Sequence, residues 1–222
     1  MNILVFGATG SIGDHIYNSF KNYSSNVYGT STQLNEFIYV DNDKLDNLGN
    51  ISQLDVVVWC QGYNVNDTIY NFKEDEYLKT MNANVLFILK TLNYLVKHNK
   101  IRDNAKLVII SSIWEEFTRD TKLSYSISKS ALQGLVKNVA YDLSSKNILI
   151  NNVLPGVVDN PMTRKTLKVE HIKYVENYLH FNRLINLDDV FNTVKFLTFE
   201  NTGITGQSIK VDLGFTHIKK YE

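Results

Sequence analysis

The stretch Ile3-Leu4-Val5-Phe6-Gly7-Ala8-Thr9-Gly10-Ser11-Ile12-Gly13 decides the fold. It opens on four apolar residues that suit a buried strand, and Ile12, Ile16 and Phe20 then recur at helical spacing. Glycines between a strand and a helix permit a tight turn and bring the backbone close to a pyrophosphate at the helix N-terminus. The stretch therefore predicts a dinucleotide-binding turn, and the alternative is a glycine-rich turn without a ligand. The residues expected to bind the cofactor here are Gly7, Thr9, Gly10, Ser11, Ile12 and Gly13.

Short apolar runs alternate with longer helical patterns along the rest of the chain. Runs this short, apolar on both faces, are typical of strands buried on both sides of a parallel sheet. Apolar stripes at helical spacing run through Leu86–Val96 and Ala131–Leu143. The predicted fold class is α/β, a single-domain doubly wound parallel sheet of Rossmann type, with about seven strands and helices on both faces. The expected strands are Ile3–Phe6, Asn26–Gly29, Phe37–Val40, Asp55–Cys60, Leu107–Ser111, Ile148–Leu154 and Ser208–Val211.

No proline-rich linker divides the chain, because its only prolines are Pro155 and Pro161. We therefore expect residues 1–222 to form one domain, with residues 160–181 as a lid that selects the substrate. The connection from Thr30 to Glu36 is short, since a parallel crossover usually takes a dozen or more residues. Either a loop replaces the usual second crossover helix, or one of the two strand assignments is wrong.

The composition excludes several classes of protein. The chain has 222 residues, of which 44% are hydrophobic and 21% charged, as in an ordinary globular protein. Its 23 basic and 23 acidic residues give no net charge, which argues against nucleic acid as a partner. Its apolar runs are far shorter than the ~20 residues of a membrane span, and the N-terminus does not resemble a signal peptide. With one cysteine, Cys60, and five scattered histidines, we expect a cytoplasmic protein with neither a membrane partner nor a metal.

The end of the second expected strand bears on the choice of cofactor. A carboxylate at this position usually binds the ribose hydroxyls of NAD and would repel the 2′-phosphate of NADP. This chain has hydroxyl side chains there instead, on Thr30, Ser31 and Thr32. The sequence therefore favours NADP, but NAD stays open because no Arg or Lys stands there to attract the phosphate.

Tyr125 and Lys129 are the residues that point to chemistry. They stand four apart in a helical pattern and therefore share one helix face, although a surface pair could have the same spacing. An ammonium about 4 Å from a phenol favours the phenolate by about 4 kcal/mol at an effective dielectric of about 20, or about three pKa units. We expect Lys129 to bring the pKa of Tyr125 close to the working pH. Ser112 follows an expected strand at the carboxyl end, where ligands bind in open α/β sheets.

Together these motifs resemble the short-chain dehydrogenase/reductase family along nearly the whole chain. Gly7–Gly13 is similar to the cofactor loop of the family, and Ser112 stands at the family's spacing, thirteen residues before Tyr125. Asn82, in Met81-Asn82-Ala83-Asn84-Val85, matches the family's helix asparagine. Further matches are Asp41, Gln61-Gly62, Pro155-Gly156-Val157-Val158, Thr205-Gly206-Gln207-Ser208 and Val211-Asp212-Leu213-Gly214.

The resemblance implies an NAD(P)(H)-dependent enzyme of the carbonyl reductase type, which interconverts a ketone and a secondary alcohol by hydride transfer. Tyr125 would be the general acid/base, and Lys129 would also hold the nicotinamide ribose. Ser112 would donate to the substrate oxygen, and Asn82 would hold a water in a proton relay. Family members commonly form dimers or tetramers, so a homodimer or homotetramer is expected. The further cofactor contacts implied are Asp41, Asn42, Gln61, Gly62, Tyr125, Lys129, Pro155, Gly156 and Val158.

Departures from the family pattern place the chain among its shorter, divergent members, and Trp59-Cys60 in place of an Asn-Asn pair is one of them. Two other functions stay open. The chain could sense a dinucleotide without turnover, or it could be a sugar-nucleotide epimerase or dehydratase. The early Gly10 favours an epimerase, and the short C-terminal part counts against it. In the expected lid, Arg164, Lys165 and Lys168 would suit an anionic substrate, although a solvated helix face is the simpler interpretation.

Overall fold

The computed structural model describes residues 1–33, 35–166, 169–179 and 181–218. Within these residues, seven strands form one sheet in the order β3-β2-β1-β4-β5-β6-β7, and every neighbouring pair is parallel. The order reverses between β1 and β4, which is where open α/β sheets bind ligands. The strands are β1 (Asn2–Phe6), β2 (Asn26–Ser31), β3 (Ile38–Tyr39), β4 (Leu54–Trp59), β5 (Ile101–Ile110), β6 (Leu149–Pro155) and β7 (Ser208–Val211).

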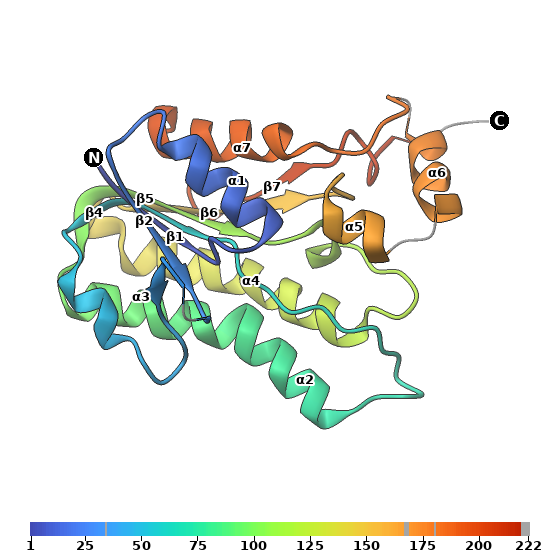
Figure 1. The fold of residues 1–222 in the computed structure, drawn as a ribbon, viewed down its shortest axis with the longest axis horizontal. Coiled ribbons are helices and arrows are strands. Elements are labelled where there is room, and N and C mark those ends of the chain that lie inside the picture. The colour runs from blue at the N-terminus through green and yellow to red at the C-terminus, as the bar shows by residue number, and fades with distance from the viewer. Residues whose placement is uncertain (34, 167–168, 180, 219–222) are drawn as a thin grey trace.

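Helices cover both faces of the sheet. Figure 1 shows α1 and α7 on one face and α2, α3 and α4 on the other. The predicted doubly wound α/β fold is therefore confirmed. The α-helices are α1 (Ser11–Phe20), α2 (Glu74–Met81), α3 (Phe87–Lys97), α4 (Leu123–Asp142), α5 (Pro161–Thr166), α6 (Val169–Tyr178) and α7 (Leu187–Lys195). A π-helical turn, Asn82–Leu86, joins α2 to α3.

Each face of the sheet has its own apolar core. On the side of α3 and α4, the fully buried rings of Phe6 and Trp59 stack with centroids 5.5 Å apart. The indole Nε1 of Trp59 donates to Oγ1 of Thr91 at 2.9 Å, so this large side chain satisfies its one polar atom inside the core. On the other side, Phe20 of α1 meets Phe191 of α7 edge-on at 5.4 Å. Trp59 at the family's asparagine position is therefore a core residue.

The short connection between β2 and β3 contains no helix among its described residues. The two strands still pair in parallel, with Thr30 opposite Ile38. Phe37 fills part of the space beside them, because its ring meets Tyr17 of α1 edge-on at 5.0 Å. A Cβ on Gly29 would lie 2.5 Å from the Phe37 ring, so only glycine fits under it. Both strand assignments are thus confirmed, and a loop replaces the second crossover helix.

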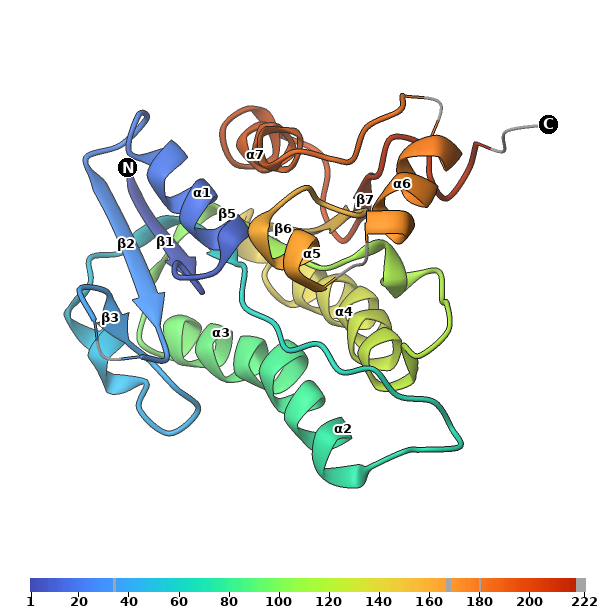
Figure 2. The same cartoon turned by 45° about the vertical axis from the view of Figure 1, so that its right-hand side comes forward.

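The carboxyl ends of the strands lie along one edge of the sheet, since all pairs are parallel. Figure 2 shows that α5 lies close to the end of β6 and that α6 lies beyond it. Of the helices in the described part of the chain, none has the length and apolar character that crossing a bilayer requires.

Candidate active site

The loops that follow β1 and β4 touch at the point where the strand order reverses. Gly7 has φ +74°, and a Cβ on it would lie 2.8 Å from the backbone nitrogen of Gln61. A Cβ on Gly13 would lie 2.1 Å from the carbonyl oxygen of Gly7, so glycine allows α1 to sit directly against the loop. The helix begins at Ser11, and no side chain caps its N-terminus. The arrangement leaves the first-turn amides of a ten-residue helix available to a phosphate.

Polar atoms without partners line the same edge. The amide Oδ1 of Asn42 and both amide atoms of Gln61 are buried, and the described residues offer them no hydrogen bond. Buried polar atoms are normally hydrogen-bonded, so these atoms are available to bind a polar ligand such as a dinucleotide. Of the other loop residues expected to bind it, Thr9 and Gly10 are exposed, whereas Ser11 and Ile12 are half-buried.

The hydroxyl residues at the end of β2 are not equally available. Thr30 and Ser31 are buried within the strand, and only Thr32 lies exposed beyond it. The Oγ of Ser31 already accepts hydrogen bonds from the Gln33 amide at 2.9 Å and from the side-chain amide of Asn35 at 3.2 Å. Thr32 is therefore the hydroxyl of this set that is open to a ribose or its phosphate.

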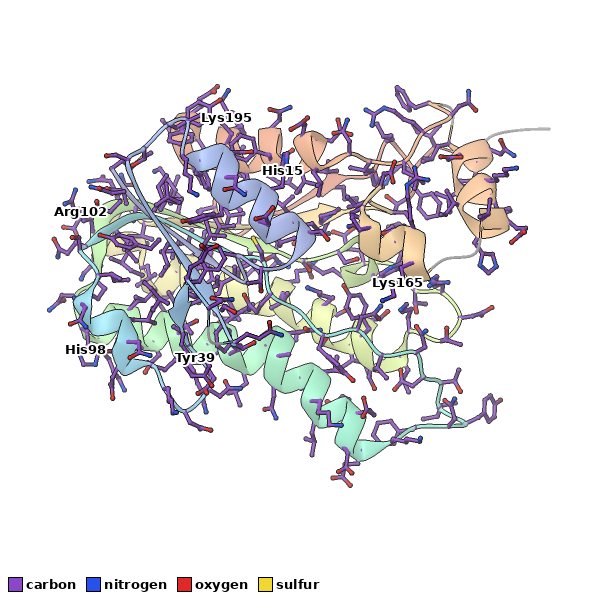
Figure 3. The ribbon with its side chains drawn as sticks, in the orientation of Figure 1. His15, Tyr39, His98, Arg102, Lys165 and Lys195 are labelled. Carbon is purple, nitrogen blue, oxygen red and sulfur yellow. The ribbon has the colours of Figure 1, made fainter. Side chains whose placement is uncertain are left out.

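The carboxylate of Asp41 stabilises the turn that follows β3. Its carboxylate accepts from the Tyr39 hydroxyl at 2.5 Å and from the amides of Asp43 and Lys44, each at 2.8 Å (Tyr39 is labelled in Figure 3). The hydrogen bond from Tyr39, followed by that from the Asp43 amide, lowers the pKa of Asp41. The carboxylate is therefore ionised at neutral pH and keeps acceptor capacity, which suits an amino group of an adenine.

The segment after β6 is fixed by backbone contacts. The amide of Gly156 donates to the Val211 carbonyl at 2.9 Å, and a Cβ on Gly156 would lie 3.2 Å from Asp212. Val158 is buried and pairs in parallel with Ile185. Pro155 ends β6 and is buried as well. These residues are positioned to contact a ligand mainly through backbone atoms.

Tyr125 and Lys129 lie near the start of α4 and face the inside of the molecule. Lys129 is only 3% exposed, and its Nζ donates to the carbonyl oxygen of Ile110 at 3.2 Å. The same Nζ lies 5.7 Å from the centroid of the Tyr125 ring. A Cβ on Gly62 would lie 3.9 Å from it, so the lysine also adjoins the loop after β4.

The structure does not show the expected lowering of the Tyr125 pKa by Lys129. Burial raises the pKa of Tyr125 to about 12, and a hydrogen bond with Ser112 opposes this increase. Burial likewise lowers the pKa of Lys129 to about 8, and the charge of Glu115 opposes that decrease. The expected decrease of three pKa units left out the cost of burial, which disfavours the charged form of both groups. In the structure Nζ of Lys129 lies 5.7 Å from the centroid of the Tyr125 ring, and burial is the largest influence on the pKa of each group.

Ser112 and the turn after it are tied to three neighbouring elements. The Ser112 hydroxyl accepts from the Trp114 amide at 3.4 Å, beside the Tyr125 phenol. Glu115 ends the turn and is 5% exposed, and its carboxylate accepts from Nδ2 of Asn152 at 3.0 Å and from Oγ of Ser208. These contacts of Glu115 join segments that are far apart in the sequence, so sequence reasoning could not find them.

The asparagine at the site is Asn84, which corrects the expectation for Asn82. Asn82 is exposed, whereas Asn84 is fully buried in the π-helical turn. The Asn84 side chain donates to Oγ of Ser128 at 2.8 Å and to the Tyr63 carbonyl at 2.9 Å, and it accepts from the Tyr63 amide at 2.7 Å. Both asparagines lie in Met81-Asn82-Ala83-Asn84-Val85, and the signal that separates them is that only Asn84 is one helical turn from the buried Ile88.

The expected lid is only partly described. Its first basic residue, Arg164, donates to both carboxylate oxygens of Asp159 at 2.6 and 2.7 Å, so its charge is already paired. Lys165 is exposed on the same helix (Figure 3). Lys168 lies outside the described residues. The amide of Thr163 donates to Oδ1 of Asn160 at 2.8 Å, which caps α5. The basic cluster therefore offers an anionic substrate less charge than the sequence implies.

Comparisons with known proteins point to one family. Residues 46–216 match the family model described as Enoyl-(Acyl carrier protein) reductase. The 3-oxoacyl-(acyl-carrier-protein) reductase FabG of Buchnera aphidicola is 24% identical, over 95% of this chain and 95% of its own length. The glucose 1-dehydrogenase of Gluconobacter oxydans is 26% identical, over 76% of this chain and 65% of its own. Among solved structures, ElxO with NADP bound superimposes with a TM-score of 0.86 at 23% identity, covering 96% of this chain and 98% of its own.

Proposed function

The chain belongs to the short-chain dehydrogenase/reductase family, and from this premise we propose that it interconverts a ketone and a secondary alcohol with NADP(H) or NAD(H), Tyr125 being the general acid/base. One observation carries the proposal. The glycine loop touches Gln61, the neighbouring Gly62 adjoins Lys129, and Lys129 lies beside Tyr125. A proton donor and a dinucleotide loop thus share one edge of the sheet.

Each residue of the site has a separate role in ketone reduction. When bound, the nicotinamide supplies the hydride. Tyr125 gives its proton to the substrate oxygen, so that the phenol O–H bond breaks as the alcohol O–H bond forms. A phenol whose pKa is raised to about 12 holds that proton at neutral pH, which favours its role as an acid. The Ser112 hydroxyl donates to the oxygen on which charge develops, and Lys129 stabilises the phenolate.

Asn84, rather than Asn82, orders the wall of the site in this proposal. It joins the loop after β4 to α4, because it contacts both Tyr63 and Ser128. A relay water would depend on this asparagine.

NADP is the cofactor favoured. Asn42, Gln61 and the N-terminus of α1 would hold the dinucleotide, and Thr32 is the exposed hydroxyl nearest the end of β2. No Asp or Glu occupies residues 30–33, so nothing there would repel a 2′-phosphate. The relative ElxO has NADP bound in its solved structure. Fluorescence titration with NADPH and NADH tests this preference, and a tighter Kd for NADH would reverse it.

We extend the proposal to the domain organisation, the location and the assembly of the protein. Residues 1–222 would act as one domain in the cytoplasm, with residues 160–181 over the substrate. A homodimer or homotetramer would cover the exposed Leu78, Leu86 and Leu89, which lie along α2, the π-helical turn and α3. Light scattering behind size exclusion measures the assembly, and a monomer at micromolar concentration would exclude it.

A turnover panel tests the activity. The purified protein is incubated with NADPH or NADH and with cyclohexanone, ethyl acetoacetate or fructose, and the loss of nicotinamide absorbance is followed. We expect saturable reduction of at least one carbonyl class. A protein that binds NADPH tightly but reduces none of the three would favour the sensing module instead.

A further inference from the structure

A lysine that the proposed chemistry does not use lies buried beside Tyr125. Lys122 immediately precedes α4 and is 4% exposed. Its Nζ donates to Oδ1 of Asn64 at 2.6 Å and to Oδ1 of Asn66 at 2.8 Å, both in the loop after β4. Burying an ammonium is unfavourable unless partners are supplied, and here two amide oxygens converge on one. These contacts hold the ammonium of Lys122 in place inside the protein.

The ammonium of Lys122 lies close to the ring of Tyr125, the proposed proton donor. Nζ of Lys122 lies 5.4 Å from the centroid of the Tyr125 ring, slightly nearer than Nζ of Lys129 at 5.7 Å. Lys122 lies just before α4 and Lys129 lies one helical turn after Tyr125, so the two ammonium groups reach the ring from the N-terminal and the C-terminal side of Tyr125 along the chain. The ring therefore has two ammonium groups within 6 Å, a distance at which cations interact with aromatic rings.

We propose that Lys122 is a positioning residue for proton transfer, whose ammonium stabilises the negative charge that develops on Tyr125 as it gives up its proton. The inference rests on the proposed function, in which Tyr125 protonates the substrate oxygen. A unit charge at the 5.4 Å that separates Nζ from the ring centroid, at an effective dielectric of about 20, would favour a phenolate charge spread over the ring by about a hundredfold. Because the phenolate is only partly formed in the transition state, a rate effect of about tenfold to a hundredfold is expected.

The surroundings of Lys122 give the effect a pH dependence. Burial, followed by the charge of Arg119, lowers the pKa of Lys122 to about 8 against the opposing charge of Asp67. Asp67 itself is held by the Ser124 amide at 3.0 Å. The ammonium is therefore present at pH 7 and lost above about pH 8. An arginine at this position would keep its charge at both pH values.

A structural role is the competing explanation, since Lys122 also joins the loop at Asn64 and Asn66 to α4. The test uses Lys122→Gln, which keeps hydrogen-bond donors without the charge, and Lys122→Arg, which keeps the charge. Lys79→Gln is the control, because Lys79 is an exposed lysine on α2 that pairs with Glu76. Circular dichroism melting establishes that each variant folds.

The measurement is kcat/KM for NADPH with cyclohexanone, ethyl acetoacetate and fructose as probes, at pH 7 and pH 9.5. At pH 7 we expect Lys122→Gln to be tenfold to a hundredfold slower than the wild type, and Lys122→Arg and Lys79→Gln to be within threefold of it. At pH 9.5 the ratio of wild type to Lys122→Gln should approach one, and Lys122→Arg should exceed both. Because all variants keep Lys129, its titration changes each kcat/KM in the same way and drops out of the ratios.

Each other outcome overturns a definite part of the account. If Lys122→Gln matches the wild type at pH 7, or if both Lys122 variants lose activity equally at both pH values, the inference is wrong and the proposed function stands. If Lys122→Gln does not fold, the comparison of Lys122→Arg with the wild type decides, and equal pH profiles refute the inference. If the wild type reduces none of the probes, the proposed function fails and the inference fails with it.

Discussion

Removing the buried carboxylate of Glu115 tests quantitatively how the candidate site is held together. In Glu115→Ala, the half-buried hydroxyl of Ser208 and the buried side-chain amide of Asn152 lose their acceptor. Each unsatisfied donor costs about 1–3 kcal/mol, so we expect a loss of about 4 kcal/mol. For a chain of this size that is a fall of about 8–16 °C in Tm. The Ser130 hydroxyl bonds the backbone oxygen of Glu115 and should survive.

The assay is urea unfolding, with Glu116→Ala as the matched control. Glu116 is the next residue and pairs with Lys210 near the surface, so its loss should cost less than about 1 kcal/mol. Glu115→Gln should be close to wild type at low pH, since its amide group can accept from Asn152 and donate to Ser208. A cost below about 1 kcal/mol for Glu115→Ala would refute the bonding scheme.

The pH dependence of the same variants gives a second readout. Burial raises the pKa of Glu115, and the hydrogen bonds from Ser208 and Asn152 only partly oppose it. A carboxyl whose pKa is higher in the folded state than in the unfolded state stabilises the fold when protonated, and that stability is lost as pH rises through the folded pKa. Glu115→Gln should therefore gain stability relative to the wild type as the pH rises above about 4.5, the ordinary pKa of a glutamate. A constant difference across that range would contradict the raised pKa.

Three further predictions follow from the site. Ser112→Ala should lower kcat by about a hundredfold to a thousandfold with the NADPH Kd unchanged, and a matching loss of binding would contradict its role at the substrate oxygen. Gly13→Ala should weaken NADPH binding at least a hundredfold, because its Cβ would meet the oxygen of Gly7 at 2.1 Å, whereas Gly134→Ala has open space and should bind normally. Lys129→Met should abolish turnover yet stabilise the protein by about 2 kcal/mol at pH 7 in urea unfolding, because a buried ammonium with a pKa of about 8 is costly. This gain should shrink between pH 8 and pH 10.5 as the wild-type lysine loses its charge, and a gain that is constant with pH would refute it.

The fold could be predicted from sequence because its signals are local. The apolar run before Gly7 and the glycines up to Gly13 fix a strand, a turn and a helix within the first 20 residues. The short link after Thr30 left two possibilities, and pairing of β2 with β3 decides between them. Tyr125 and Lys129 could be found because residues four apart on a helix share a face.

What sequence reasoning missed depends on contacts between distant segments. Asn82 and Asn84 lie two residues apart, and the hydrogen bond of Asn84 to Ser128 of α4 shows that Asn84 is the one at the site. Glu115 reaches Ser208 across 93 residues of sequence. The pKa of Tyr125 depends mainly on its burial, which the spacing of Tyr125 and Lys129 does not give.

Turnover by Tyr125→Phe tests the central claim most directly. The phenylalanine keeps the ring and removes the proton, so we expect kcat with NADPH and the best carbonyl of the panel to fall about a thousandfold at an unchanged NADPH Kd. Tyr141→Phe, which alters an exposed tyrosine at the other end of α4, should behave as the wild type. A Tyr125→Phe protein that keeps wild-type turnover would show that the proton comes from another group and that the assignment of this site is wrong.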